Sequence, residues 1–272
     1  MGSFVLLHNN FYPKSANILM QNIKTLLEKL QIPFEKSQNI TLEGKFLPFI
    51  NRVEYYKKLF LLFLKAQEEN HKILVCDSQS LLEIMRFFAN FYEETELREV
   101  LLKECETEID ILSLENSFIF APEVILNALK TYNFKRRWEG FKCAFFVDRE
   151  LEKIVVESQM ISTLEERTGL KILPFFKESY AYLLQTNPPL AYSMGATDYY
   201  EMVDGGVDFI LTPNIGNFEL MDRCAEKLRN TKGRDDLEIP LLFIPQVILA
   251  LFDETTSSIL HFGEHIISPK ML

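Results

Sequence analysis

The sequence predicts an α/β protein with two pseudo-repeated Rossmann-like lobes and mostly parallel sheets. Short apolar runs alternate with longer amphipathic segments along the chain, which is the order of βαβ units. The two halves also share a layout. In each, one strand-like run ends in polar residues, and a later run leads through a four-residue loop into a helix. The lobes are expected at residues 1–138 and 139–272 of the 272-residue chain.

The first half contains two strand-like runs and five helical patterns. The strand-like runs are short and apolar, and they are SFVLLHN (3–9) and KILVC (72–76). The helical patterns repeat apolar residues at spacings of three and four, and they cover residues 15–31, 53–70, 78–94, 94–113 and 121–132.

The second half contains four strand-like runs, FKCAFFVD (141–148), LKILPFF (170–176), VDFILT (207–212) and PLLFIP (240–245). Helical patterns cover residues 158–169 and 198–206, follow the loop at 214–217, and begin again near Gln246. Gly169 ends the first of these helices in the manner of a C-terminal glycine.

The charge balance disfavours nucleic-acid binding. The net charge is −10, from 39 acidic and 29 basic residues, whereas nucleic-acid binding depends on a basic surface that faces phosphates. The cluster Lys135-Arg136-Arg137 is interpreted as a solvated turn. No secretory signal is recognisable, and the longest apolar stretch, IPLLFIPQVILALF, is too short to cross a bilayer. We therefore expect a cytoplasmic protein without a transmembrane segment.

The four cysteines do not form a local metal or redox motif, because none lies two or three positions from another. The sequence also lacks a P-loop, a dinucleotide-binding glycine motif, a nucleophile elbow and a zinc-protease motif. Standard motif-based classes of enzyme therefore receive no support.

Polar side chains gather where the predicted parallel strands end, which is where α/β proteins hold ligands. The candidate ligand-binding residues are His8, Asn9, Cys76, Gln79, Arg149, Glu150, Asn214 and Asn217. Two interpretations stay open for them. They form a binding cleft, or they are a solvated rim in which Asn217 caps a helix and Asn214 satisfies a turn.

Five stretches resemble, in order and spacing, the B-type subunits of heterodisulfide reductase and their relatives with paired cysteine-rich "CCG" domains. They are FVLLHNNFYPKSANILMQNIKTLLEKLQIPFE (4–35), ILVCDSQSLLEIM (73–85), GFKCAFFVDREL (140–151), GGVDFILTPNIGNFELMD (205–222) and IPLLFIPQVILALFD (239–253). The match covers almost the whole chain and implies two CCG-like lobes.

The resemblance also implies an iron–sulfur cluster in each lobe, held by an early cysteine, an adjacent cysteine pair and a C-x-x-C. Here the early positions are Asn9 and Arg149, and the C-x-x-C positions are 76–79 and 214–217. The cysteine-pair positions lie in TLEGK (41–45) and YSMG (192–195), where no cysteine remains. Cys76 is the one cysteine left in the ligand positions. One thiolate does not hold a cluster, so no iron–sulfur cofactor is expected.

The leading hypothesis is a cluster-free relative of these B-type heterodisulfide reductase proteins, acting as a non-catalytic interaction protein or as a binder of a small polar ligand. The alternative is an oxidoreductase or electron-transfer subunit that acts with redox partner proteins. A third hypothesis is a new enzyme built from the polar residues of the former cluster loops. A protein of a redox complex is the expected partner.

The former ligand loops predict a specific geometry. Asn9 is expected near Cys76, and Arg149 near Asn214, each at the carboxyl end of a strand. The guanidinium group of Arg149 is expected to point into the second loop cluster and to take the structural place of the cation, because it can donate to Asn214 and Asn217.

Overall fold

The computed structural model describes residues 3–109, 112–234, 238–253 and 255–270, and the chain divides into two compact units. Unit 1 consists of Met1–Phe11 and Ile32–Ala121, and unit 2 of Tyr12–Gln31 and Pro122–Leu272. The division into lobes at residues 1–138 and 139–272 stays a prediction about descent. The compact units group the chain differently, because Tyr12–Gln31 and the segment that begins at Pro122 both belong to unit 2.

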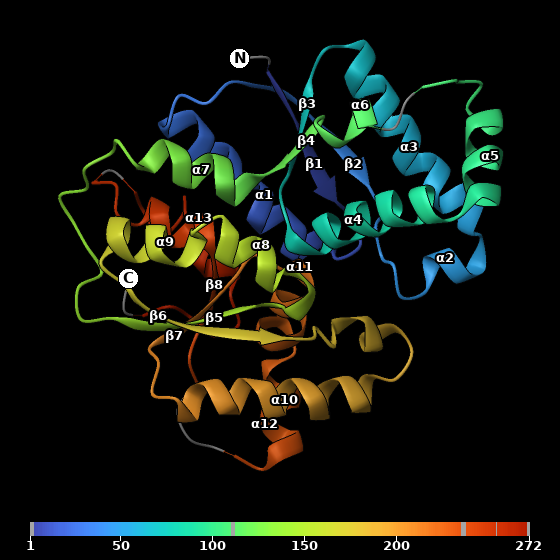
Figure 1. Ribbon diagram of the computed structural model, residues 1–272. Coiled ribbons are helices and arrows are strands. Elements are labelled where there is room, and N and C mark those ends of the chain that lie inside the picture. The colour runs from blue at the N-terminus through green and yellow to red at the C-terminus, as the bar shows by residue number, and fades with distance from the viewer. Residues whose placement is uncertain (1–2, 110–111, 235–237, 254, 271–272) are drawn as a thin grey trace. The chain divides into compact units, whose positions relative to one another are not determined.

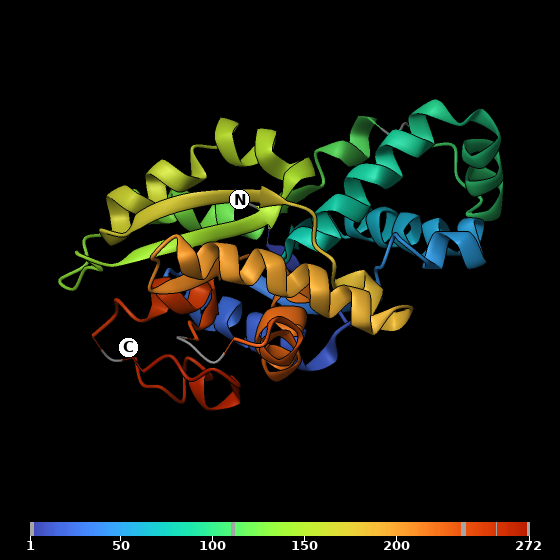
Figure 2. The same cartoon turned by 90° about the horizontal axis from the view of Figure 1, so that it is seen from below.

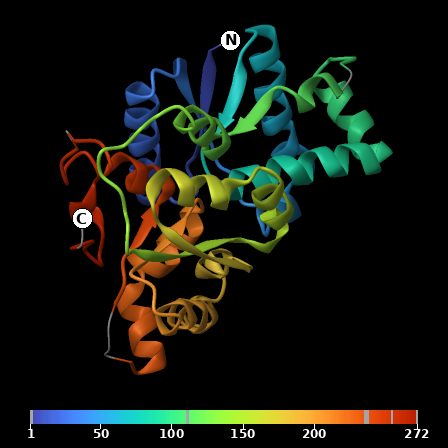
Figure 3. The ribbon, with the colours of Figure 1, turned by 60° about the vertical axis from the view of Figure 1, so that its left-hand side comes forward.

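Unit 1 is built on a parallel sheet with the strand order β2-β1-β3-β4. The strands are β1 (Phe4–Asn9), β2 (Phe34–Ile40), β3 (Lys72–Val75) and β4 (Phe118–Phe120). Strands β1, β3 and β4 lie side by side in Figure 3. The side chains of β1 and β3 are buried on both faces, as expected for the central strands of a parallel sheet.

The helices of unit 1 are α2 (Leu47–Ile50), α3 (Arg52–Glu68), α4 (Ser78–Glu93), α5 (Thr95–Glu104) and α6 (Leu112–Glu115). Helices α3, α4 and α5 pack against one another (Figure 1). Phe60, Phe63, Phe87 and Phe91 of α3 and α4 are fully buried, and Phe87 has its ring centroid 5.7–6.1 Å from those of the other three. The high phenylalanine content of the sequence therefore supplies the core of this unit.

Unit 2 repeats the same topology, with the strand order β6-β5-β7-β8 and parallel pairing throughout. The strands are β5 (Lys142–Asp148), β6 (Lys171–Lys177), β7 (Phe209–Thr212) and β8 (Leu241–Phe243). Both sheets thus place their first strand between the second and the third. This confirms the predicted α/β fold with two pseudo-repeated Rossmann-like lobes.

Helices cover both faces of the unit 2 sheet. The α-helices are α1 (Pro13–Lys29), α7 (Ala121–Leu129), α8 (Glu152–Glu157), α9 (Met160–Thr168), α10 (Pro188–Asp204), α11 (Ile215–Phe218), α12 (Ala225–Lys232) and α13 (Ile244–Leu249). Short turns are η1 (Arg149–Leu151), η2 (Ala181–Gln185), the π-helical η3 (Glu219–Arg223) and η4 (Phe262–Glu264). Figures 1 and 2 both show α10 on one side of β5 and β6, with α8 and α9 on the other.

Helix α1 belongs to unit 2 although it directly follows the first strand of unit 1. It starts at Pro13, a favourable first helical residue, and packs against α11 and α13. The hydroxyl of Tyr12 donates to the carbonyl of Ala181 (2.8 Å), and Ser15 donates to Glu219 (2.5 Å). Side-chain contacts distant in sequence, rather than chain order, therefore assign this helix to its unit.

Several elements differ from the sequence prediction: β2, β4, α2 and α8 were not predicted, and α10 begins at Pro188, ten residues before the predicted start at 198. Strand β2 carries exposed polar residues on the sheet edge, and β4 is only three residues long, so neither gives a strong apolar signal. The helix predicted at 94–113 ends at Glu104 in α5, and residues 110–111 of that prediction lie outside the described residues.

Candidate functional site

In unit 1, the three segments that the resemblance assigns to cluster ligands meet at the backbone of Leu42. The carboxamide nitrogen of Asn9 donates to the carbonyl of Leu42 (3.0 Å), and its oxygen accepts from the backbone N–H of Leu42 (3.1 Å) and of Phe11 (3.1 Å). Gln79 donates to the same Leu42 carbonyl (3.0 Å). The first strand end, the 41–45 loop and the C-x-x-C position are thus joined by two amide side chains.

The C-x-x-C position of unit 1 begins α4. Cys76 is 3% exposed, and its thiol contacts the carbonyl oxygen of Leu74 (3.4 Å). Asp77 caps α4 by accepting from the backbone N–H of Ser80 (2.9 Å) and from its hydroxyl (2.7 Å). Cys76 is therefore a buried residue directly before a helix start that Asp77 caps.

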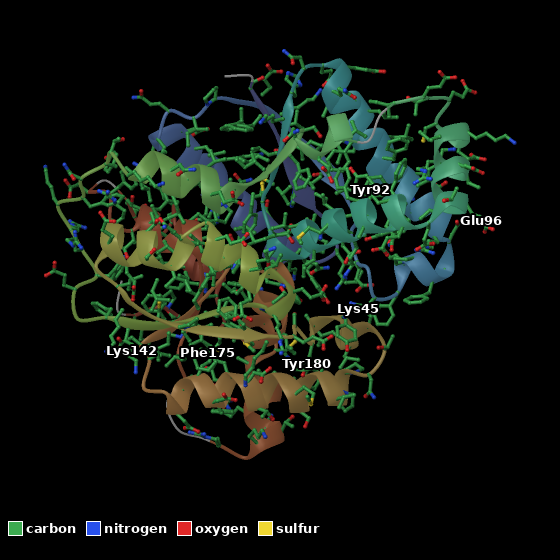
Figure 4. The ribbon with its side chains drawn as sticks, in the orientation of Figure 1. Lys45, Tyr92, Glu96, Lys142, Phe175 and Tyr180 are labelled. Atoms are coloured by element: carbon green, nitrogen blue, oxygen red, sulfur yellow. The ribbon has the colours of Figure 1, made fainter. Side chains whose placement is uncertain are left out.

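The 41–45 loop also brings two buried carboxylates near each other. Glu43 accepts from the backbone N–H groups of Lys45 (2.9 Å) and Phe46 (2.8 Å). Glu83 accepts from the hydroxyl of Tyr55 (2.9 Å) and from Arg86 (2.6 Å), and burial raises the pKa of its carboxyl group. Figure 4 labels Lys45, which marks this loop.

Gly44 is required where it stands, because a Cβ atom there would lie 1.9 Å from a carboxylate oxygen of Glu83. Sequence reasoning did not single out Glu83. A signal was present, since this charged residue shares a helical face with Phe87 four positions later, and charged residues are rarely buried without partners.

In unit 2, the buried carboxylate of Asp148 is the central group. The carboxamide nitrogen of Asn214 donates to Asp148 Oδ2 (2.6 Å), and Asp148 is 7% exposed. Burial raises the pKa of Asp148, an effect that the hydrogen bond from Asn214 opposes in part. The end of β5 and the C-x-x-C position are therefore joined by a carboxylate–amide pair.

Asn214, not Asn217, caps α11. Its carboxamide oxygen accepts from the backbone N–H groups of Gly216 (2.7 Å) and Asn217 (3.1 Å). Thr212 accepts from the backbone N–H of Asn214 (3.1 Å) and donates to the carbonyl of Phe146 (2.8 Å). Thr212 thus ties the end of β7 to β5, and Asn214 ties the loop to the start of α11.

The prediction that Arg149 points into this loop cluster is wrong. Arg149 and Glu150 are both exposed, and the preceding residue, Asp148, makes the bond to Asn214. Strand β5 ends at Asp148 and Arg149 begins the turn η1, so Asp148 is the last strand residue and the one that reaches Asn214. Of the other candidates, His8 is half-buried on β1.

The cysteine-pair position of unit 2 lies within α10. Ser193 and Met194 are half-buried, and a Cβ atom on Gly195 would lie 2.7 Å from a methyl group of Leu220. Gly195 therefore permits close packing of α10 against η3. This contact with Leu220 is apolar, whereas Gly44 in the 41–45 loop of unit 1 lies against the carboxylate of Glu83.

A separate cavity of about 720 Å³ lies in unit 1, between the end of β2, α2 and α3. None of the eight candidate residues lines it, but Asn10 and Thr41 do, next to Asn9 and Leu42. Within the described ranges, no group of three or more His, Cys, Asp or Glu side chains is arranged to hold a metal ion. Nor does any helix in the part of the chain that the structure covers have the length and apolarity needed to cross a membrane.

Comparisons with solved structures support the fold. A hypothetical protein from Helicobacter pylori is similar with a TM-score of 0.79 and 20% sequence identity, over 97% of this chain and 52% of that chain. The chain therefore spans about half the length of that protein. An aspartate racemase homologue from Pyrococcus horikoshii OT3 gives a TM-score of 0.32 at 9% identity, over 92% of this chain and 99% of that one, and carries no argument.

No curated protein sequence matches the chain. A family model described as the HdrB-like C-terminal domain matches residues 180–266, which contain α10, the loop at 214–217 and β8. Residues 180–266 of this chain are therefore similar to the HdrB-like C-terminal domain.

Proposed function

We propose that the protein is a cluster-free, non-catalytic relative of the B-type heterodisulfide reductase proteins that acts in the cytoplasm as an interaction protein. The observation that carries this proposal is the closure of both loop clusters by their own side chains. Asn9 is 1% exposed and uses both ends of its amide on Leu42 and Phe11, and Asn214 is 2% exposed and bonds Asp148.

An iron–sulfur cluster does not fit the residues of unit 1. Several thiolates must converge on iron, and Cys76 is the one cysteine at the former ligand positions. The amide of Asn9 and that of Gln79 both donate to the Leu42 carbonyl, in the place where ligand loops would have to face a metal. Amide nitrogen atoms that donate hydrogen bonds do not ligate iron.

A cluster does not fit unit 2 either. Its central groups are Asp148 and Asn214, joined at 2.6 Å, so no space separates them for a metal ion between these two atoms. Burial raises the pKa of Asp148, so keeping this carboxylate ionised as a ligand costs free energy. The same closure disfavours a small polar ligand at Asn214, which favours protein interaction as the role. A protein of a redox complex is the proposed partner, in keeping with the family.

The proposal is tested by anaerobic purification after expression with added iron and cysteine. Iron and acid-labile sulfide are measured, and the visible absorption spectrum is recorded beside that of an iron–sulfur protein from the same cells. We expect far less than one iron per chain and no absorption band from a cluster. Bound iron and sulfide near a cluster's stoichiometry would instead support an electron-transfer role.

The interaction role is tested by affinity purification of the tagged protein from its native host at low and at moderate salt. We expect a protein partner that remains bound in near-stoichiometric amount. A protein that elutes alone in both conditions, while turning over a redox substrate, would contradict a non-catalytic interaction role.

A further inference from the structure

The cavity of about 720 Å³ in unit 1 has a size typical of small-molecule sites. One wall is α3, another is the short helix α2, and the strand-end segment at 38–41 forms a third. Strand β2 lies at the edge of its sheet. The cavity therefore opens at the edge of the unit, beside the closed loop cluster rather than inside it.

Most of the wall is apolar. Its apolar side chains are Ile40, Leu47, Ile50, Tyr55, Leu61 and Leu62. Ile50 is 79% exposed and Leu61 is 44% exposed, so two large aliphatic groups face solvent at this site. The hydroxyl of Tyr55 is fixed by its bond to Glu83, which holds the phenol ring as a rigid part of the wall. Such a surface gains free energy when an apolar group covers it.

The charge of the pocket is opposite in sign to that of the chain. Two lysines and one glutamate line it, Lys58, Lys65 and Glu54, whereas the chain has a net charge of −10. Lys58 and Glu54 form an exposed pair at 3.7 Å, a contact that water screens strongly. The ammonium group carries three donors, so Lys58 can bond an anion while it stays beside Glu54.

We propose that this pocket binds a small amphipathic organic anion, a carboxylate on an apolar body. The aliphatic and aromatic side chains would cover the apolar body, and Lys58 and Lys65 would attract the carboxylate at the rim. Amide side chains of Asn10, Asn39 and Asn51 line the same pocket and add hydrogen-bond donors. This inference does not depend on the proposed function, because Asn9, Cys76 and Gln79 do not line the pocket and the proposed contacts do not use Thr41, its one lining residue from the 41–45 loop.

The test uses anilinonaphthalene sulfonate, an amphipathic anion whose fluorescence rises when an apolar site covers it. We expect saturable binding at one site on the purified chain, displaced by decanoate. Decanol and acetate, which have only the apolar body or only the anion, should each require about tenfold higher concentration for the same displacement.

Two neighbouring residues provide a matched pair of variants. Ile50 lines the pocket and is 79% exposed, and Phe49 does not line it and is 86% exposed. Both substitutions, Ile50→Asp and Phe49→Asp, replace an exposed apolar residue of α2, so the fold should tolerate both equally. We expect Ile50→Asp to raise the dissociation constant about tenfold and Phe49→Asp to change it less than about twofold.

A second pair of variants tests the contribution of Lys58 to binding. Lys58→Met removes a pocket cation, whereas Lys153→Met removes a lysine of a similar exposed pair, 3.8 Å from Glu157 on α8. We expect Lys58→Met to weaken probe binding about fivefold and to reduce its dependence on salt, with Lys153→Met close to the wild type. Urea unfolding midpoints within error of the wild type show that each variant is folded.

Several outcomes would overturn the proposal. Equal weakening by Ile50→Asp and Phe49→Asp would mean that the probe covers the surface of α2 rather than the pocket. Decanol competing as well as decanoate would remove the role of the anion. A dimer that Ile50→Asp converts to monomer would identify a second copy of the chain as the occupant. Iron content is measured separately, so failure here is distinct from failure of the proposed function.

Discussion

Unit 1 joins its strand end to the neighbouring loop through an asparagine that bonds to backbone groups, whereas unit 2 uses an aspartate that bonds to a side chain. Asn9 holds the backbone of Leu42 in both directions, and Asp148 holds the amide of Asn214. The two segments at the cysteine-pair positions, 41–45 and 192–195, also differ in their contacts. In unit 1 the segment contacts the buried carboxylate of Glu83, and in unit 2 its counterpart packs as a helix on Leu220.

Two units with the same strand order therefore join their strand ends to neighbouring segments through interactions that differ in their free-energy cost. A neutral amide pairs with a backbone peptide group without burying a charge. A buried carboxylate costs free energy in its ionised form, which appears as a raised pKa for Asp148. Unit 2 should therefore depend more strongly on a single side-chain pair, and on pH.

The largest expected effect is that of Asn214→Ala. This change removes the bond to Asp148 and the cap on the backbone N–H groups of Gly216 and Asn217. We expect a loss of about 3 kcal/mol in the free energy of unfolding. The single tryptophan, Trp138, is buried in unit 2, so its fluorescence during urea unfolding reports on this unit.

Asn187→Ala is the control for a lost cap alone. Asn187 accepts from the backbone N–H of Leu190 (3.3 Å) at the exposed start of α10. Its loss should cost about 1 kcal/mol. Equal losses for the two variants would mean that the pair of Asp148 and Asn214 adds nothing to the stability of unit 2.

In unit 1, Asn9→Ala should cost about 2–3 kcal/mol, because the buried backbone N–H of Leu42 loses its acceptor and the carbonyl loses one of two donors. Gln79→Ala removes only the second donor from a half-buried position and should cost about 0.5–1 kcal/mol. Far-UV circular dichroism during urea unfolding measures both. A larger loss for Gln79→Ala would contradict the central place given to Asn9.

The two close-packed glycines sharpen the comparison further. Gly44→Ala should cost about 2 kcal/mol, because the carboxylate of Glu83 is held by Tyr55 and Arg86 and has little freedom to move. Gly195→Ala should cost about 1 kcal/mol, since the aliphatic side chain of Leu220 can adopt another rotamer.

A double variant checks this explanation by urea unfolding. Glu83→Asp shortens the acidic side chain, so Gly44→Ala should cost less in that background than in the wild type. Additive losses would show that the contact between Gly44 and Glu83 is not the source of the effect.

The last expected effect is the pH dependence that Asp148 confers. Its pKa in the folded protein lies above the ordinary value of 3.8, so the native state binds this proton more tightly than the unfolded state does. Its contribution to stability is greatest below pH 3.8 and declines as the pH rises toward the folded pKa.

Asp148→Asn keeps a side-chain acceptor for Asn214 and removes the titration. Within that window, the wild type should lose about 1 kcal/mol per pH unit relative to this variant. Urea unfolding at a series of pH values measures the difference. Glu83, whose pKa is also raised by burial, is present in both proteins and cancels in the comparison. Parallel pH profiles would contradict a buried, titrating Asp148.

Local sequence patterns accounted for the α/β class and for most element positions. Apolar runs such as VDFILT (207–212) contain β7, and periodic apolar residues mark α1 and α4. The order of strands and helices, with right-handed crossovers, then favours parallel sheets. Strand β2 was missed because a polar edge strand buries too little to leave an apolar pattern.

The sequence by itself determined that polar residues stand at the strand ends and that most ligand cysteines are absent. Asn9 ends β1, Cys76 and Asn214 follow strands β3 and β7, and Gln79 and Asn217 lie in the first turns of α4 and α11. These features are local, because they depend on residue type and on strand and loop positions that neighbouring residues set.

Only the tertiary structure decided what the loops hold. It placed Asp148 inward and Arg149 outward, brought Glu83 against Gly44, and packed α1 on α11 and α13. Each of these results depends on a side-chain direction or on a partner far away in the chain. The turn η1 that follows β5 sets the direction of Arg149, and distant partners meet only when packing of the whole unit lowers the free energy.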